Sequence, residues 1–196
     1  MSTGTTTSRS QRNKNDNSWL SGTTLWIVGG ILLVIIAAPL AMNVLGGDDT
    51  PEVLEGHVVE MPDEGRDHVA EGTTVEYESD PPTSGPHYAS WAPAGIHREV
   101  VPDELLVHNL EHGHIVIYYT TDTSRLSDES VAKITELTEE FDGQWDAVLA
   151  VPRPDMDGEL TLTAWNYKME LDSFDEELID AFVEAYRGRG PENPIR

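Results

Sequence analysis

The stretch VHNLEHGHIVIYY, residues 107–119, decides the fold, because its sequence pattern predicts the end of a helix followed directly by the start of a strand. Upstream of it, Pro102 suits the first position of a helix, and the two acidic residues that follow suit the positive end of the helix dipole. Gly113 can take the left-handed backbone conformation that ends many helices. We therefore predict a short helix over residues 102–112.

The apolar half of this stretch, HIVIYYT at residues 114–120, is β-branched or aromatic on both faces, which predicts a central strand buried on both sides. Two later segments, residues 127–141 and 173–186, open on a serine that can cap a helix and repeat apolar residues at helical spacing. Residues 146–152 and 159–167 favour strands and flank a turn-rich connection, so we predict that they form a hairpin. Together these elements indicate an α+β fold, a small mixed sheet with helices packed on it.

An uncharged apolar run precedes this domain, from residue 25 to residue 45. At about 1.5 Å of rise per residue, such a run spans a hydrocarbon core about 30 Å thick, which predicts one N-terminal transmembrane helix. A cleaved signal peptide is the alternative, but its apolar region is about 7–15 residues long and ends in a small-residue cleavage motif, whereas APLAM is a poor one. We therefore predict a single-pass protein of the cell membrane.

The charges around the apolar run predict its orientation. Residues 1–18 are polar, with three basic residues and one acidic residue. Short basic flanks tend to stay in the cytoplasm, so we predict a disordered cytoplasmic tail over residues 1–18. Residues 46–55 then form a tether, and residues 56–193 form an extracytoplasmic α+β domain that ends in a loose tail from residue 187.

The composition excludes several classes of function. The chain of 196 residues has a formal net charge of −24, with 12 lysine and arginine residues against 36 aspartate and glutamate residues. A surface this acidic repels nucleic acids and anionic headgroups, so we predict no nucleic-acid binding. A surface adapted to high salt and a surface that attracts cations both fit this composition. The chain has no cysteine, which excludes disulfides and thiolate metal sites.

Three residues of the predicted helix share one face. His108 and His112 are four residues apart, about one helical turn, so that both imidazoles can bind one ion. Glu111 lies at the edge of this face. The spelling His-x-x-Glu-His also matches the inverted zincin pattern, in which the glutamate activates a metal-bound water. Such a hydrolase needs a distant third ligand and a substrate cleft, and a domain of about 140 residues leaves little room for both, so metal binding without catalysis is the preferred interpretation.

A third histidine has to come from elsewhere in the chain. His87, in the proline-rich loop of residues 81–88, is the best candidate, since the prolines hold that loop rigid. His114 is a further candidate, and its contribution depends on the turn that precedes it. Imidazole and carboxylate suit zinc and copper(II). The predicted ligands of a zinc or copper ion are therefore His87, His108, His112 and Glu111.

These histidines also have a purely structural interpretation. A histidine in the last turn of a helix complements the dipole, and a partly buried ring with hydrogen-bonded nitrogens needs no metal. The domain would then be a non-catalytic interaction or structural module of the cell envelope, with protein partners that the sequence does not identify. His57, His68 and His97 stand alone in polar surroundings and are assigned to the surface. The aromatic residues assigned to the core are Trp91, Trp145, Trp165, Tyr88, Tyr118, Tyr119 and Tyr167.

Several motifs resemble those of a known family. PPTSGPHY at residues 81–88, followed by Trp91 and Gly95, and VHNLEHG at residues 107–113 are similar to motifs of the domain-of-unknown-function family 3105, as is RGRGPEN near the C-terminus. The resemblance covers residues 55–193. It implies a bacterial or archaeal protein with one N-terminal membrane span and an exported domain, and it transfers no catalytic role.

The resemblance also bears on the predicted ligands. His87 lies in the first motif, and the other three predicted ligands lie in the second. His114 falls just outside the second motif, and His97 occupies a position where the resemblance leads us to expect an aromatic residue. Both departures lower the standing of these two histidines as ligands.

Overall fold

A computed structural model of the chain describes residues 1, 4 and 51–193. The predicted transmembrane helix, nearly all of the predicted cytoplasmic tail and half of the tether therefore lie outside the described residues. Within the part that is described, none of the helices is both long and apolar enough to cross a membrane. Residues 51–193 belong to one unit with its own hydrophobic core.

The main sheet grows outward from β5 (Ile115–Thr120), the strand predicted from the apolar half of the opening stretch. β6 (Val148–Arg153) lies parallel to β5 on one side, and β7 (Leu160–Ala164) lies antiparallel to it on the other. β8 (Tyr167–Leu171) then pairs antiparallel with β7. Parallel and antiparallel pairs meet in β5, which confirms the mixed sheet.

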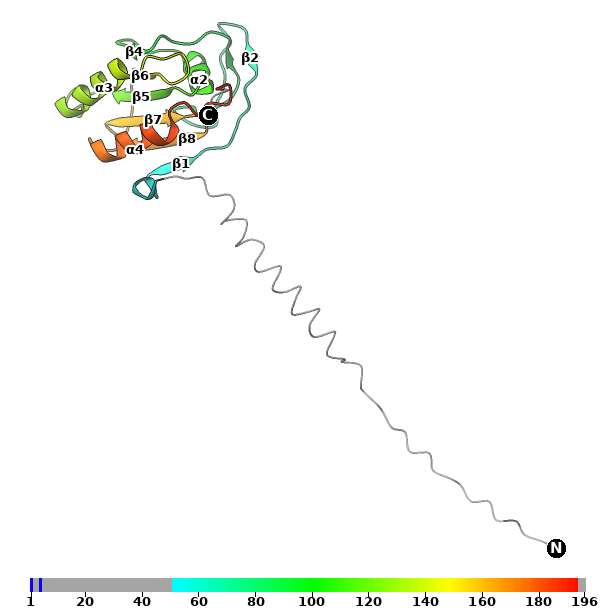
Figure 1. Ribbon diagram of the computed structural model, residues 1–196. Helices are drawn as coiled ribbons and strands as arrows, with labels where there is room; N and C mark the ends of the chain where they lie inside the picture. Colours follow the sequence, from blue (N-terminus) through cyan, green and yellow to red (C-terminus); the bar gives the residue numbers. More distant parts are fainter. Residues whose placement is uncertain (2–3, 5–50, 194–196) are drawn as a thin grey trace. The chain divides into compact units, whose positions relative to one another are not determined.

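Shorter strands form the edges of the sheet. β1 (Val58–Glu60) pairs with β8 and β4 (Gly95–Ile96) pairs with β6, which gives the order β1-β8-β7-β5-β6-β4 (Figure 1). A second, two-stranded sheet consists of β2 (His68–Val69) and β3 (His87–Tyr88), in parallel. Its register places His68 opposite His87, which brings a segment near the start of the domain against the end of the proline-rich loop.

Helices cover both faces of the main sheet. α3 (Asp128–Glu140) and α4 (Glu176–Tyr186) pack on one face, and α2 (Asp103–Glu111) packs on the other (Figure 1). The side chain of Ser127 caps α3 as predicted. Asp175, rather than the predicted serine, caps α4. The α+β class is thereby confirmed, with the sheet as the middle of three layers.

β5 is buried on both faces, as predicted, because its side chains alternate between two cores. Ile115 and Ile117 belong to the larger core, under α3 and α4. Val116 and Tyr118 belong to a smaller core, under α2. A period of two residues thus divides one apolar strand between two layers of helices.

The predicted hairpin between residues 146–152 and 159–167 is wrong. β6 and β7 do not pair, because β5 lies between them and pairs with both. The second segment instead contains β7, a turn in which Asn166 has a positive φ of 64°, and the start of β8. Strands pair through backbone hydrogen bonds along their edges, so the local pattern of side chains does not reveal which strands become neighbours.

The domain begins before residue 56, where the sequence pattern placed its start. Residues 52–54 form a 3-10 turn, η1 (Glu52–Leu54), that packs against α4. Leu54 is 1% exposed and belongs to the larger core. The last part of the predicted tether is therefore part of the folded unit.

α2 ends at Glu111, and Gly113 terminates the helix as predicted, in the left-handed conformation with a positive φ of 93°. The N–H of His114 donates to the carbonyl of Asn109 at 3.0 Å, and the N–H of Gly113 donates to the carbonyl of Leu110 at 2.9 Å. These two hydrogen bonds define a Schellman motif, which satisfies two of the carbonyls that the end of a helix leaves open.

The segment after α4 is docked on the domain, so the predicted loose tail is wrong. The N–H of Gly188 donates to the carbonyl of Gly113 at 2.7 Å, and the N–H of Glu192 donates to the carbonyl of Glu111 at 3.1 Å. A Cβ on Gly190 would lie 2.2 Å from the Glu111 carbonyl oxygen, so only glycine permits this close approach. The segment docks on the end of α2 because that end has carbonyls in need of donors.

This contact predicts the cost of a side chain at Gly113. The positive φ of Gly113 is strained for any residue with a Cβ. An added Cβ would also lie 2.8 Å from the backbone nitrogen of Gly190. Gly113→Ala should therefore lower the free energy of unfolding by about 2–4 kcal/mol, from backbone strain and overpacking together. Gly72→Ala is the matched control, because Gly72 has a φ of +85° and a Cβ added to it would have nothing within 4 Å. Urea unfolding with a chelator present measures both, and equal losses would contradict the packing argument.

Candidate functional site

Histidine and carboxylate side chains gather where α2, the β2–β3 pair and the C-terminal segment meet. Within each of two groups, one ligand atom from every residue lies within 4.8 Å of the others. The members of the first group are His68, His87, His108 and Glu111. The members of the second group are His108, His112 and Glu192.

The ring of His87 is fixed by the loop that carries it. Its Nδ1 lies 2.8 Å from the carbonyl oxygen of Gly85, and a carbonyl can only accept, so Nδ1 carries the proton. The ring is fully buried, and its Nε2 lies 3.0 Å from Oε2 of Glu111. His87 therefore presents Nε2 to the interior of the first group.

The ring of His108 is fixed in the same way. Its Nδ1 donates to the carbonyl oxygen of Tyr88 at 2.7 Å, so the neutral ring has its lone pair on Nε2. This Nε2 lies 3.1 Å from Nε2 of His112, in the second group. Two backbone carbonyls of one loop thus set the tautomers of both His87 and His108, as partners of metal-binding histidines do.

The contact between His87 and Glu111 needs either a proton or a cation between its two atoms. In the neutral tautomer, the lone pair of His87 Nε2 points at an oxygen of the Glu111 carboxylate, which is also an acceptor. A proton shared by the two side chains, whichever of them carries it, or a bound cation resolves this conflict. Both side chains are buried, so water does not screen it.

Hydrogen bonds hold α2 in place near both of its ends. Asn109 is fully buried, and its side-chain amide makes two hydrogen bonds of 2.9 Å to the backbone of Ala92. Near the start of the helix, Arg153 on β6 donates to Asp103 at 2.7 Å. These contacts fix the helix against the loop that precedes it and against the sheet, so the site is built on rigid elements.

His114 does not belong to either group. Its Nε2 donates to the carbonyl of Gln144 at 2.7 Å, and its Nδ1 accepts from the side chain of Asn109 at 3.0 Å. Both ring nitrogens are thereby occupied, which gives this residue the structural role that the sequence left open. His112 lies in the second group and not in the first, so the four predicted ligands are divided between two neighbouring groups.

His68 joins the site although no sequence pattern indicates it. Its Nε2 lies 3.8 Å from Oε2 of Glu111, and its ring stacks on that of His108 with centroids 5.3 Å apart. Its side chain is 46% exposed, so the surface assignment was right about exposure and wrong about isolation. The two-residue pairing of β2 with β3 brings it there, and a strand that short has no sequence pattern. Glu192 was missed for a similar reason, because its segment was interpreted as loose.

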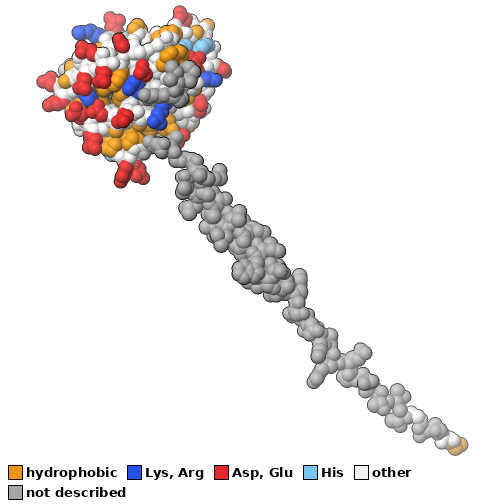
Figure 2. All heavy atoms as spheres, viewed as in Figure 1, with side chains coloured by type: hydrophobic (Ala, Val, Ile, Leu, Met, Phe, Trp, Pro, Cys, Tyr) orange, Lys and Arg blue, Asp and Glu red, His pale blue; other side chains and the backbone are white. Residues whose placement is uncertain are grey.

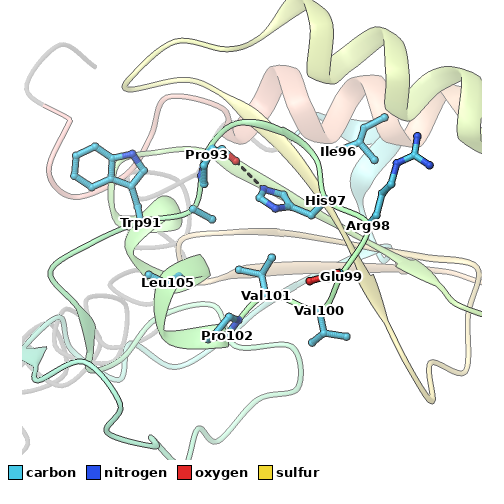
Figure 3. A pocket seen from close by; sticks show the side chains of 11 residues that line it. Trp91, Pro93, Ile96, His97, Arg98, Glu99, Val100, Val101, Pro102 and Leu105 are labelled. Atoms are coloured by element: carbon cyan, nitrogen blue, oxygen red, sulfur yellow. Dashed lines mark hydrogen bonds between the residues drawn. The ribbon is translucent and has the colours of Figure 1, made fainter.

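Trp91 covers the site from outside. It is 45% exposed, which corrects its assignment to the core, and its ring lies 5.3 Å from that of His108 and 4.7 Å from that of His112. Trp91 also stands at one end of a surface groove of about 570 Å³, beside β4 (Figure 3). Neither group contributes a ligand residue to the lining of this groove, so the groove and the histidine cluster are separate features.

Burial favours the neutral form of two of these histidines, His108 and His112. Burial lowers the pKa of His108, against the hydrogen bond to the Tyr88 carbonyl, which raises it. Burial also lowers the pKa of His112 to about 4, and the neighbouring rings of His108 and His114 act in the same direction. Metal ligation requires neutral imidazole, so these two rings are in the form that binds a cation at neutral pH.

The fold and the site together define a class of protein: an α+β domain with a buried cluster of histidine and glutamate side chains. The chain belongs to the family described as "Protein of unknown function (DUF3105)", whose model matches residues 68–195. The family assignment made from the motifs is thereby confirmed. Neither a curated protein nor a solved structure matches the chain.

The pKa of His112 predicts how stability depends on pH. An unfolded histidine binds a proton near pH 6.5, whereas folded His112 does so only near pH 4. The unfolded state thus binds more protons in this window, so the free energy of unfolding should fall as the pH is lowered from about 6.5 to about 4. Urea unfolding of the metal-free chain at pH 7 and at pH 5 measures the effect.

Substitution isolates the contribution of this ring. His112→Gln should reduce the loss of stability between pH 7 and pH 5, whereas His57→Gln should leave it unchanged, because His57 is exposed and lies outside both groups. An identical pH dependence in the wild type and in His112→Gln would show that the ring does not contribute.

Proposed function

We propose that the domain binds one transition-metal ion, zinc or copper, through the first group. His87, His108 and Glu111 are the buried ligands, and exposed His68 is the outer ligand. The observation that carries the proposal is the pair of hydrogen bonds from Nδ1 of His87 and His108 to backbone carbonyls. These bonds leave the lone pair of each buried ring on Nε2. Both Nε2 atoms lie within one group with the buried carboxylate of Glu111.

The distances between the ligand atoms support an ion of this size. Zinc bonds of about 2.0–2.1 Å in tetrahedral geometry place neighbouring donor atoms about 3.3 Å apart. Nε2 of His87 lies 3.0 Å from Glu111 Oε2, and Nε2 of His68 lies 3.8 Å from the same oxygen. Side-chain shifts of a few tenths of an ångström would bring such pairs to the distance that coordination requires.

The donor types favour a divalent ion over copper(I). Imidazole and carboxylate suit zinc and copper(II), whereas copper(I) prefers thiolate and thioether. The chain has no cysteine, which removes the thiolate ligand that copper(I) prefers. Met169 is buried in the larger core, under α3 and α4. The ion is therefore zinc or copper(II).

The arrangement favours metal binding over hydrolysis. In the inverted zincin pattern both histidines bind the ion, and the glutamate stays free to activate a water. Here Glu111 lies with His87 among the ligand atoms of the first group, while His112 belongs to the second. This grouping supports a role for Glu111 as a ligand, and the proposed role is the handling of a metal ion rather than turnover of a substrate.

The proposal includes the location of the domain. Residues 25–45 would anchor the chain in the cell membrane as a single span, with the N-terminus in the cytoplasm and the domain outside. The described surface agrees with a role in attracting cations, since Figure 2 shows many acidic and few basic side chains on the face in view. The proposal includes no nucleic-acid partner, because a surface this acidic repels a polyanion.

A titration of the chain with zinc tests the proposal. The full-length chain, purified in mild detergent, should bind one zinc ion with a Kd below about 1 μM, and His108→Ala should bind about 100-fold more weakly, since it removes a ligand. His57→Ala, a substitution outside both groups, should bind as the wild type does. Isothermal titration calorimetry measures all three.

The same titration separates the proposal from the structural interpretation. If the domain is a non-catalytic envelope module without a metal, the wild type binds no zinc. His108→Ala then lowers thermal stability by the same amount with a chelator as with zinc. If the ion is bound, zinc stabilises the wild type by about 2.7 kcal/mol at 100 times its Kd, and His108→Ala loses this gain.

A further inference from the structure

The second group has the properties of an ion position of its own. Nε2 of His112 lies 3.1 Å from Nε2 of His108 and 3.3 Å from Oε2 of Glu192, both close to the distance of about 3.3 Å between neighbouring ligands of a tetrahedral ion. His112 is buried, and its Nδ1 has no hydrogen-bond partner among the described residues. Two imidazoles and a carboxylate are a common set of ligands for zinc.

The two groups share His108, and this residue has only one nitrogen to offer. Its Nδ1 donates to the Tyr88 carbonyl, so Nε2 must serve either group. The single lone pair of an imidazole nitrogen binds one ion at a time. Occupation of one group therefore excludes full coordination in the other.

The two groups also differ in the metal affinity that their ligands predict. The first group offers four ligands, and the rings of His87 and His108 are both fixed by backbone carbonyls. The second group offers three, and no partner holds the Nδ1 of His112 among the residues that the structure describes. Fewer and less oriented ligands bind an ion more weakly.

The C-terminal segment brings its carboxylate to this position. Glu192 is 38% exposed, and its backbone N–H donates to the carbonyl of Glu111. Asn193 strengthens the docking, because its side chain donates to the carbonyls of Trp145 and Gly188 at 3.2 and 2.8 Å. The second group is therefore completed only when the segment after α4 lies against the end of α2.

From these contacts we infer that His108, His112 and Glu192 form a second and weaker position for the same zinc or copper(II) ion, occupied in alternation with the first. His108 passes from one set of ligands to the other as the ion moves between them. The C-terminal segment thereby becomes part of the metal centre. This inference rests on the proposed function, since it requires that His108 bind metal.

Removal of the first group isolates the second. The full-length variant His87→Ala/Glu111→Gln should still bind one zinc ion, about 100-fold more weakly than the wild type. Adding Glu192→Gln to this variant should weaken binding at least tenfold further, whereas adding Glu184→Gln, an exposed glutamate on α4, should change nothing. The wild type should bind one ion and not two, because His108 is shared. Isothermal titration calorimetry gives affinities and stoichiometry together.

Several outcomes would overturn the inference while leaving the proposed function intact. These are a wild type that binds two ions, or a His87→Ala/Glu111→Gln variant whose residual binding is absent or indifferent to Glu192→Gln. A wild type that binds no zinc would overturn both. Urea unfolding with a chelator verifies that each variant folds. If His87→Ala/Glu111→Gln does not fold, His68→Ala/Glu111→Gln replaces it, since His68 is exposed and its removal leaves no cavity in the core.

Discussion

The site depends on two hydrogen bonds between histidine rings and the backbone. The carbonyls of Gly85 and Tyr88 each accept from an Nδ1–H, and this choice of tautomer decides what the rings of His87 and His108 can do on their other side. Without these bonds, either ring could place its proton on Nε2 and satisfy the nearby acceptors without a cation. With them, the neutral rings direct two lone pairs into a buried space that also contains the Glu111 carboxylate. That arrangement of acceptors is the basis of the proposed cation binding.

The fold supplies the precision that such an arrangement needs. α2 lies between the loop that provides the carbonyls and the sheet, tied to the loop by Asn109 and to the sheet by the pair of Arg153 and Asp103. Its end is closed by the Schellman motif at Gly113 and covered by the C-terminal segment. The segments that carry PPTSGPHY, VHNLEHG and RGRGPEN thus meet at one place in the structure, although about 100 residues separate the first from the last in the sequence.

The sequence predicted correctly those features of the fold that depend on interactions between neighbouring residues. The glycine stop at Gly113, the serine cap of α3 and the double-sided burial of β5 all depend on a few neighbouring residues, and all three are confirmed. The pairing of strands was predicted wrongly, because β5 separates β6 from β7 and no local pattern states which strands become neighbours. Long-range pairing also hid two members of the site. His68 is brought in by a two-residue strand, and Glu192 by backbone contacts between glycines.

The central claim is that a cation, rather than a proton, lies between His87 and Glu111. A crystal structure of the zinc-treated chain, with anomalous scattering recorded at the zinc absorption edge, tests this directly. We predict one ordered peak about 2.0–2.1 Å from Nε2 of His87, from Nε2 of His108 and from an oxygen of Glu111. A site without an anomalous peak, with the 3.0 Å contact between His87 and Glu111 unchanged, would contradict this claim and would favour a proton-bridged structural pair.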